Sequence, residues 1–477
     1  MTLPTSASPK TIQASPLRQS LLAGAVALAF ALPLAVHGQQ PPPKLDDPAA
    51  GLRAAEKSAK RNDMTTLYRD ALANDSQFAA ARFQYQATLE REPQARAGLL
   101  PNVALTADAF QRRYDSFDPD FGNTFSDMRG GLSLSVPVYR PQNWEALEQA
   151  KLVVVQGESV LQQARQELLL RLANAYFNVL GARDQVIALE VSKEATLQQL
   201  AQAKREFEVG TKTIIDTNEA QARYDQIVAQ LQVAVGTLLI RRNELAAIVG
   251  RDPELLAALD DNPKLSLPQP NDINTWVKSA EDANFGVRIA RASNEIATRE
   301  IQRAKDGHKP TVDLVANYNA SKFNGTQTSD NNFRANSGNV GLQFTLPLYS
   351  GGITQSRVRE ALSLQERAAA DLETARRTAA NAARSSLTGV NFGLTQVQAL
   401  ESAERSARTQ LESTRLGYQV GVRIQLDVLN ATTQLVATQR DLKRARYDFL
   451  LSGLNLKASA GALTEDDLRA VNALLTQ

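Results

Sequence analysis

The chain carries one pattern of residues twice, and this duplication constrains its fold more than any other feature. The segment Gly131–Tyr139 reads Gly-Leu-Ser-Leu-Ser-Val-Pro-Val-Tyr, and Gly341–Tyr349, 210 residues later, reads Gly-Leu-Gln-Phe-Thr-Leu-Pro-Leu-Tyr. Further pairs recur at nearly the same spacing: Asn74 with Asn284, Pro101 with Pro310, Gly210 with Gly421, and Asp216 with Asp427. A unit this long exceeds a solenoid repeat. The sequence therefore predicts two structurally equivalent copies, residues 63–272 and residues 273–477.

Each copy shows the same succession of helical and strand patterns. An amphipathic helical stretch, about 64–98 and then 275–307, precedes a proline and a run of alternating apolar and polar residues. A polar segment follows, about 113–129 and 322–337, and then a second alternating run. We expect two strands per copy of about nine to eleven residues, the length that a tilted strand needs to cross an outer membrane. Long polar loops would join them.

The second part of each copy lacks helix-breaking residues over long distances. No proline occurs between Pro141 and Pro253 or after Pro347, and Ala, Leu, Gln, Glu and Arg are abundant. The pattern predicts helices over about 142–208 and 354–419, each roughly 100 Å long. Each helix ends at a Val-Gly pair, after which a helical pattern restarts. We therefore expect two long helical hairpins.

The N-terminus has the features of a secretory signal peptide. Lys10 and Arg18 precede an apolar run from Leu21 to Val36, which is too short for a spanning helix. We expect residues 1–38 to be removed on export and residues 39–62, which begin proline-rich, to form a flexible linker. An exported chain without cysteine points to the periplasm or outer membrane of a Gram-negative cell.

The charge balance and the scarcity of reactive side chains exclude several functions. The chain has 53 Lys and Arg against 51 Asp and Glu, a net charge of +2, which gives no general reason to bind nucleic acid. It has no cysteine and two histidines, His37 and His308, so thiolate or multi-histidine metal sites and histidine-based catalysis are not expected. We therefore predict no enzyme, no cofactor and no metal site.

The predicted strands require more than one chain. Four strands are too few to close a barrel, and an open strand edge cannot be left in lipid. Three copies would supply about twelve strands, within the range of closed outer-membrane barrels. The expected fold is therefore mainly α-helical with a membrane β-barrel, in an oligomer.

Three segments carry a resemblance to a known family. They are Arg303–Pro310 (RAKDGHKP), Val340–Gly352 (VGLQFTLPLYSGG) and Gly417–Leu429 (GYQVGVRIQLDVL). In this order, on a duplicated chain, they resemble the TolC family of trimeric outer-membrane efflux and type I secretion proteins. The resemblance covers nearly the whole chain from about Asp63. It implies a homotrimer with a twelve-stranded outer-membrane barrel continuous with a twelve-helix periplasmic tunnel, and a C-terminal equatorial segment in the second repeat.

The resemblance also implies a function and partners. Such proteins are exit ducts that carry drugs, other small molecules or unfolded proteins from inner-membrane pumps to the outside. The implied partners are a periplasmic adaptor (membrane fusion) protein, an inner-membrane efflux transporter or ABC exporter, and outer-membrane lipid. The periplasmic tip of the tunnel is expected to be closed until a partner docks.

Residues at the two hairpin tips match the family's gating positions. The resemblance places Asp216 on the first tip opposite Tyr418 and Arg423 on the second. An arginine fork and a phenol hydroxyl on a carboxylate form charge-assisted bonds that could hold a tip shut and still be broken by a partner. The simpler interpretation is solvated surface charge, which contributes little.

Asp427 matches the family's ring of carboxylates at the tunnel entrance, where three copies would attract cations. Two neighbours depart from the family pattern. Asn430 stands where a second acidic ring is expected, and Ile215 stands where a hydroxyl-bearing residue is expected. The alternative role for Asp427 is a carboxylate at a helix N-terminus, which the helix dipole favours.

The two Val-Gly pairs, Val209-Gly210 and Val420-Gly421, match grooves where the adaptor's hairpin tips would dock. The alternative is that each glycine only stops a helix, and both roles are compatible.

Two other functions would explain parts of the sequence. An extracellular coiled-coil fibre or adhesin would explain the long helices but leaves the amphipathic strands without a purpose. An enzyme would need convergent catalytic groups, and scattered carboxylates on long helices do not supply them.

Overall fold

The computed structural model describes residues 62–117, 120–211, 213–253, 255–325 and 331–476. The predicted signal peptide, 1–38, and residues 39–61 of the predicted linker lie outside the described residues. None of the helices in the described ranges contains an apolar stretch long enough to span a bilayer.

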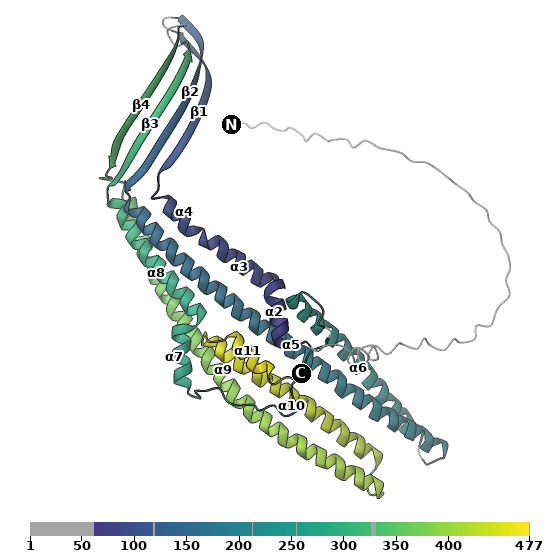
Figure 1. Cartoon of the computed structure of the whole chain (residues 1–477). Helices are drawn as coiled ribbons and strands as arrows, with labels where there is room; N and C mark the ends of the chain where they lie inside the picture. Colours follow the sequence, from purple (N-terminus) through teal and green to yellow (C-terminus); the bar gives the residue numbers. More distant parts are fainter. Residues whose placement is uncertain (1–61, 118–119, 212, 254, 326–330, 477) are drawn as a thin grey trace, which may run out of the picture. The chain divides into compact units, whose positions relative to one another are not determined.

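Helices and strands follow one another in a similar order in the two halves of the chain (Figure 1). The elements of the first half are α2 (Met64–Asn74), α3 (Ser76–Leu89), α4 (Arg91–Ala97), β1 (Asn102–Phe117), β2 (Asp120–Tyr139), α5 (Pro141–Glu208) and α6 (Ile214–Val249). Those of the second half are α7 (Ile273–Ala283), α8 (Phe285–Lys305), a 3-10 turn (Asp306–His308), β3 (Thr311–Asn324), β4 (Asn332–Thr345), α9 (Ile353–Gln419), α10 (Gln425–Ser459) and α11 (Glu465–Asn472).

The predicted N-terminal helical stretch of each half is divided into separate helices. Asp75 lies between α2 and α3, where its carboxylate accepts a 2.7 Å hydrogen bond from the backbone N of Phe78. Asn284 lies between α7 and α8 and accepts a 2.8 Å bond from Gly286 N. Short Asp and Asn side chains bond to exposed N–H groups at the start of a helix more readily than they fit a helix interior. Each therefore starts a new helix.

The two long helices match the proline-free runs that predicted them. α5 has 68 residues and α9 has 67. Pro141 stands at the first position of α5, where its missing N–H costs no hydrogen bond. α5 packs along α6 and α9 packs along α10, so that each long helix forms a hairpin with the helix after it (Figure 1). α10 also packs on α5, which joins the two hairpins.

The strands form one antiparallel sheet in the order β1-β2-β3-β4. Their lengths are 16, 20, 14 and 14 residues, longer than the predicted nine to eleven. The loops predicted at 113–129 and 322–337 were wrong over most of their length, because pairing continues to Phe117↔Asp120 and to Asn324↔Asn332. The polar residues there keep the alternation of a strand, so they extend the sheet instead of leaving it.

The sheet has one apolar face and one polar face. A representative apolar row across the four strands is Val103, Leu134, Ala316 and Val340. The adjacent row, on the other face, is Ala104, Ser133, Asn317 and Asn339. Successive side chains of a strand point to opposite faces, so the difference persists along the sheet.

An ion pair fixes the point where strand passes into helix. Arg140, between β2 and α5, donates from Nε and Nη2 to the two carboxylate oxygens of Asp313 on β3, at 2.7 and 2.8 Å. This bidentate bond raises the pKa of Arg140. The start of the first long helix is therefore tied to the second pair of strands.

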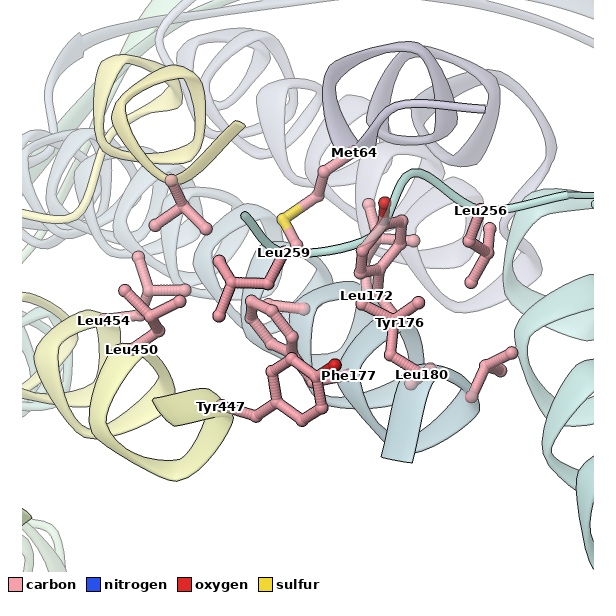
Figure 2. Close-up of a cluster of buried hydrophobic side chains, with 14 of the residues drawn as sticks. Met64, Leu172, Tyr176, Phe177, Leu180, Leu256, Leu259, Tyr447, Leu450 and Leu454 are labelled. Atoms are coloured by element: carbon pink, nitrogen blue, oxygen red, sulfur yellow. The ribbon is translucent and has the colours of Figure 1, made fainter. Parts of the chain in front are cut away.

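The main hydrophobic core joins α2, α5, α10 and the segment around Leu256 and Leu259 (Figure 2). The Phe177 ring stacks on Tyr447 with centroids 5.3 Å apart, and Tyr176 meets Phe177 edge-on at 5.8 Å. The Tyr176 hydroxyl donates a 2.7 Å bond to the carbonyl of Ala257, so this buried polar atom is satisfied. The core thus holds both hairpins to the N-terminal helix.

Candidate functional site at the helical tips

The first tip is the turn between α5 and α6. Val209 ends α5 with φ −89°, and Gly210 takes the left-handed conformation with φ 75°. Gly210 N donates to Phe207 O at 3.0 Å and Thr211 N donates to Glu206 O at 2.8 Å. This pair of bonds is a Schellman motif, which satisfies the last carbonyls of the helix and requires a residue that tolerates positive φ.

The second tip, between α9 and α10, repeats the same geometry. Val420 has φ −90° and Gly421 has φ 79°. Gly421 N donates to Tyr418 O at 3.1 Å, and Val422 N donates to Gly417 O at 2.9 Å. The helix-stop role that the sequence allowed for both Val-Gly pairs is therefore real.

The predicted acidic residues each sit in the first turn of the helix that follows. The Asp216 carboxylate accepts from Thr213 N at 2.9 Å and Thr213 Oγ1 at 2.8 Å, while Asp216 N donates to Thr213 Oγ1 at 3.3 Å. The Asp427 carboxylate accepts a longer bond, 3.4 Å, from Ile424 N. Ile424 has no side-chain oxygen to return the bond. The second tip thus has half of the capping box that stabilises the first.

Arg423 and Asp427 are brought together on the second tip. Arg423 Nη1 lies 3.7 Å from Asp427 Oδ2, and the Arg423 side chain is 62% exposed. Gly417 leaves room for the Arg423 side chain, because a Cβ at that position would lie 2.8 Å from Arg423 Cγ. An exposed pair of this kind contributes little stability in a single chain.

Tyr418 links the two hairpins through a residue that the sequence did not indicate. Gln202 Nε2, on α5, donates to the Tyr418 hydroxyl at 3.4 Å and to Glu206 Oε1 at 2.8 Å. Gln202 is one of many glutamines on these helices, and its partner lies 216 residues away. No local pattern distinguishes it.

Both tips expose apolar side chains. The most exposed are Val209 (74%) and Ile215 (65%) on the first tip and Val422 (76%) and Val420 (68%) on the second. Ile215, one of the departures from the family pattern, belongs to this surface, and Asn430 on α10 is also exposed. Apolar side chains gathered at the end of a hairpin favour contact with another protein surface.

Farther from the tips, a pocket of about 680 Å³ lies between α5, α9 and α10. Asp184 is buried there; Lys443 Nζ donates to its Oδ1 at 3.0 Å, and the Tyr447 hydroxyl donates to its Oδ2 at 2.7 Å. Burial raises the pKa of Tyr447, and the charge of Asp184 raises it further. This cluster is a charged joint between the hairpins and was not foreseen from the sequence.

Glu404 and Arg408 line the same pocket. Arg408 donates to Glu404 at 2.6 Å and holds the pKa of that carboxyl below its usual range, aided by a bond from Gln439. Within the described ranges, no group of three or more His, Asp or Glu side chains is placed to hold a metal ion.

The sequence as a whole matches one family twice. The family model described as "Outer membrane efflux protein" matches residues 67–251 and 276–462. The chain is 34% identical to Outer membrane protein TolC of Escherichia coli (strain K12) over 432 residues, which cover 88% of this chain and 86% of that protein. It is 30% identical to the alkaline protease secretion protein AprF of Pseudomonas aeruginosa, over 85% of this chain and 86% of that one.

A solved structure shares the fold. The CmeC outer membrane channel of Campylobacter jejuni superposes with a TM-score of 0.73 at 14% identity, covering 93% of this chain and 98% of that one. The family model accounts for well over half of the chain, and the full-length relatives agree with it. This chain therefore belongs to the outer membrane efflux protein family.

Proposed function

We propose that this protein is an outer-membrane exit duct, which carries the cargo of efflux pumps and type I secretion systems to the outside of the cell. Family membership supports efflux, and the relative named for alkaline protease secretion supports protein export. The protein has its place in the outer membrane, as do its relatives named TolC.

One observation carries this proposal more than any other: a sheet with an apolar face is continuous with two long helical hairpins. The apolar side chains on this face are exposed in the single chain: Leu105 is 79% exposed and Val340 is 75% exposed. A bilayer would cover that face, while the face with Ser133 and Asn317 would line water. A duct needs this arrangement, and a fibre does not.

The edges of the sheet support a closed oligomer. β1 and β4 each pair with one strand in the described sheet, which leaves one edge of each free. Unpaired N–H and C=O groups in lipid cost several kcal/mol each, so these edges require partners. A trimer would supply about twelve strands and close a barrel above a tunnel of long helices.

We also retain the two structural repeats, 63–272 and 273–477, the second with its C-terminal equatorial segment. The double match of the family model supports this division. The two tips have the same turn geometry, which supports equivalent hairpins at one end of the proposed trimer.

The tips are proposed as the gate and docking end. Tyr418 already bridges to Gln202 across the hairpins, and Arg423 is exposed enough to exchange Asp427 for Asp216 of an adjacent hairpin. Asp427 would contribute one carboxylate per chain to a cation-binding entrance. The exposed valines at Val209-Gly210 and Val420-Gly421 would receive the periplasmic adaptor.

Energy for transport would come from the partners, a periplasmic adaptor and an inner-membrane transporter or ABC exporter. The proposal requires no catalytic group and no cofactor in this chain. The fibre or adhesin alternative predicts a soluble, elongated protein.

Membrane fractionation distinguishes the two. A duct is expected in the outer-membrane fraction, as a trimer that survives detergent without heating and separates into single chains when boiled. Recovery of a soluble monomer would contradict the duct.

A further inference from the structure

One row of residues across the sheet places aromatic side chains on its polar face. Phe110 on β1 lies opposite Asp127 on β2, Asp127 lies opposite Phe323 on β3, and Phe323 lies opposite Phe333 on β4. Three phenylalanines and one carboxylate thus share one row across the four strands. We call these four residues the aromatic row.

The aromatic row is on the face opposite to the lipid-facing side chains. The next row toward the helices on its own face consists of Asp108, Arg129, Ser321 and Ala335. The intervening row, on the other face, consists of Ala109, Met128, Lys322 and Arg334. An aromatic girdle of the kind that anchors barrels in a bilayer would point outward. These rings point the other way, into the lumen of the proposed duct.

The row lies at the exit end of the lipid-facing zone. On the outer face, the apolar side chains of the rows nearer the helices give way here to Lys322 and Arg334. The following outer row, toward the strand turns, is Gln111, Ser126, Asn324 and Asn332. Cargo that leaves through the barrel would pass the aromatic row as it crosses the outer interface of the membrane.

Two arginines hold the row in place. Arg112 Nε lies 3.1 Å and Arg129 Nε lies 2.8 Å from the two oxygens of Asp127, whose carboxylate is fully buried between them. The Arg112 guanidinium lies 5.2 Å from the centre of the Phe110 ring, and that of Arg129 lies 5.6 Å from the Phe323 ring. Ion pairs and cation–π contacts therefore connect the side chains of three adjacent strands.

The rings still present free apolar surface. Phe323 and Phe333 stack with centroids 4.5 Å apart and planes 17° apart, yet Phe333 is 46% exposed and Phe110 is 47% exposed. The charges around the row, Arg112 and Arg129 against Asp108 and Asp127, balance. The site therefore offers apolar aromatic contact without attracting ions of either sign.

We infer that the aromatic row is a cargo-contact belt at the exit of the duct, which binds the planar aromatic groups of passing molecules. This inference rests on the proposed function, because the row lines a lumen only in the assembled barrel. Three copies would bring about nine phenylalanines to one level of a largely polar wall. Aromatic cargo would be retained there briefly, and purely aliphatic cargo less.

The test is block of single-channel current by 2-naphthalenesulfonate added on the side of the strand turns. Cyclohexanesulfonate, with the same charge and no aromatic ring, is the control probe. Both probes are anions, so Asp427 carboxylates at the opposite end do not attract them. The variants are Phe333→Leu and Phe323→Leu, which keep apolar volume but remove the ring. Phe344→Leu, on the lipid-facing side of β4, is the matched control.

We expect naphthalenesulfonate to block the wild type and Phe344→Leu equally, and to bind about two- to tenfold more weakly to the two belt variants. Without probe, all four proteins should form channels of the same conductance. Equal block in all four would overturn the belt while leaving the duct intact. Absence of any channel would instead overturn the proposed function, and the belt with it.

Discussion

The Tyr447 hydroxyl on α10 donates a 2.7 Å hydrogen bond to the buried carboxylate of Asp184 on α5. Lys443, one turn earlier on α10, binds the other oxygen of the same carboxylate at 3.0 Å. The two hairpins are therefore locked together in their middle, while Gln202 and Tyr418 join them near the tips by a longer bond of 3.4 Å. The middle of the hairpin pair is thus held by shorter, charge-assisted bonds than the tips are.

Replacing Tyr447 by phenylalanine should destabilise the protein by about 1–3 kcal/mol, because one oxygen of Asp184 would stay buried without its donor. The ring stack on Phe177 would remain. Denaturant unfolding of the wild type and variant measures the difference. Tyr349→Phe, at a side chain 88% exposed, is the control and should change stability by less than about 0.5 kcal/mol. Equal effects of the two substitutions would show that the Tyr447–Asp184 hydrogen bond does not stabilise the fold.

Alkaline pH should lower the stability of the folded protein through buried tyrosines of the same region. Burial raises the pKa of both Tyr176 and Tyr447 above the ordinary value of 10.0. In the unfolded chain these phenols lose their protons near pH 10, whereas the folded state keeps them, so the stability that they contribute is full below about pH 10 and falls as the pH rises further. The melting temperature measured from pH 8 to 11.5 should show this decline. A Tyr176→Phe, Tyr447→Phe double variant should show a shallower one.

Gly461→Ala should be strongly destabilising. Gly461, just after α10, has φ 66°, and a Cβ there would lie 2.3 Å from the carbonyl oxygen of Ala283. Both the strained backbone and the clash act against the folded state, with an expected loss of at least about 1 kcal/mol. Gly453→Ala is the matched control, since it lies within α10 with no atom near its Cβ position; it should stabilise by about 0.5–1 kcal/mol. Thermal unfolding measures both effects. A Gly461→Ala variant that is stabilised, as Gly453→Ala is expected to be, would show that the structure relieves the clash.

Asp427→Asn should weaken block of the channel by divalent or trivalent cations added on the tip side. In a trimer the substitution removes three carboxylates around one axis, and with Asn430 there is no acidic residue one turn along to replace them. Asp225→Asn on α6 removes the same charge from an exposed position and should leave the block unchanged. Equal block in the wild type and Asp427→Asn would remove Asp427 from the entrance and leave it as a helix-start carboxylate.

Much of the helical architecture could be predicted from the sequence because proline and glycine act locally. The proline-free run after Pro141 and the stop at Gly210 delimit α5 without any tertiary information. The strand ends could not be found in this way. Asp115 and Arg113 are polar residues in a segment expected to be a loop, but they remain paired because the register of β1 and β2 continues to Phe117 and Asp120.

The sequence could identify residues of the tip site, but it could not identify the partners that these residues contact. Arg423 and Asp427 are four residues apart, but Arg423 lies in the turn before α10, so their contact depends on the conformation of that turn. Gln202 and Asp184 could not be assigned roles, because their partners lie 216 and 263 residues away and depend on how the hairpins pack. The aromatic row likewise depends on register, which alternation alone does not fix across four strands.

The most direct test of the account is the single-channel conductance of the purified protein in a planar bilayer, for the wild type and for the Tyr418→Phe, Arg423→Ser double variant. The duct account predicts a small wild-type conductance, limited by closed tips, and a several-fold larger conductance in the variant, which loses links between hairpins. The same conductance in both would show that these residues do not hold the tip shut. No channel in either protein would contradict the duct itself.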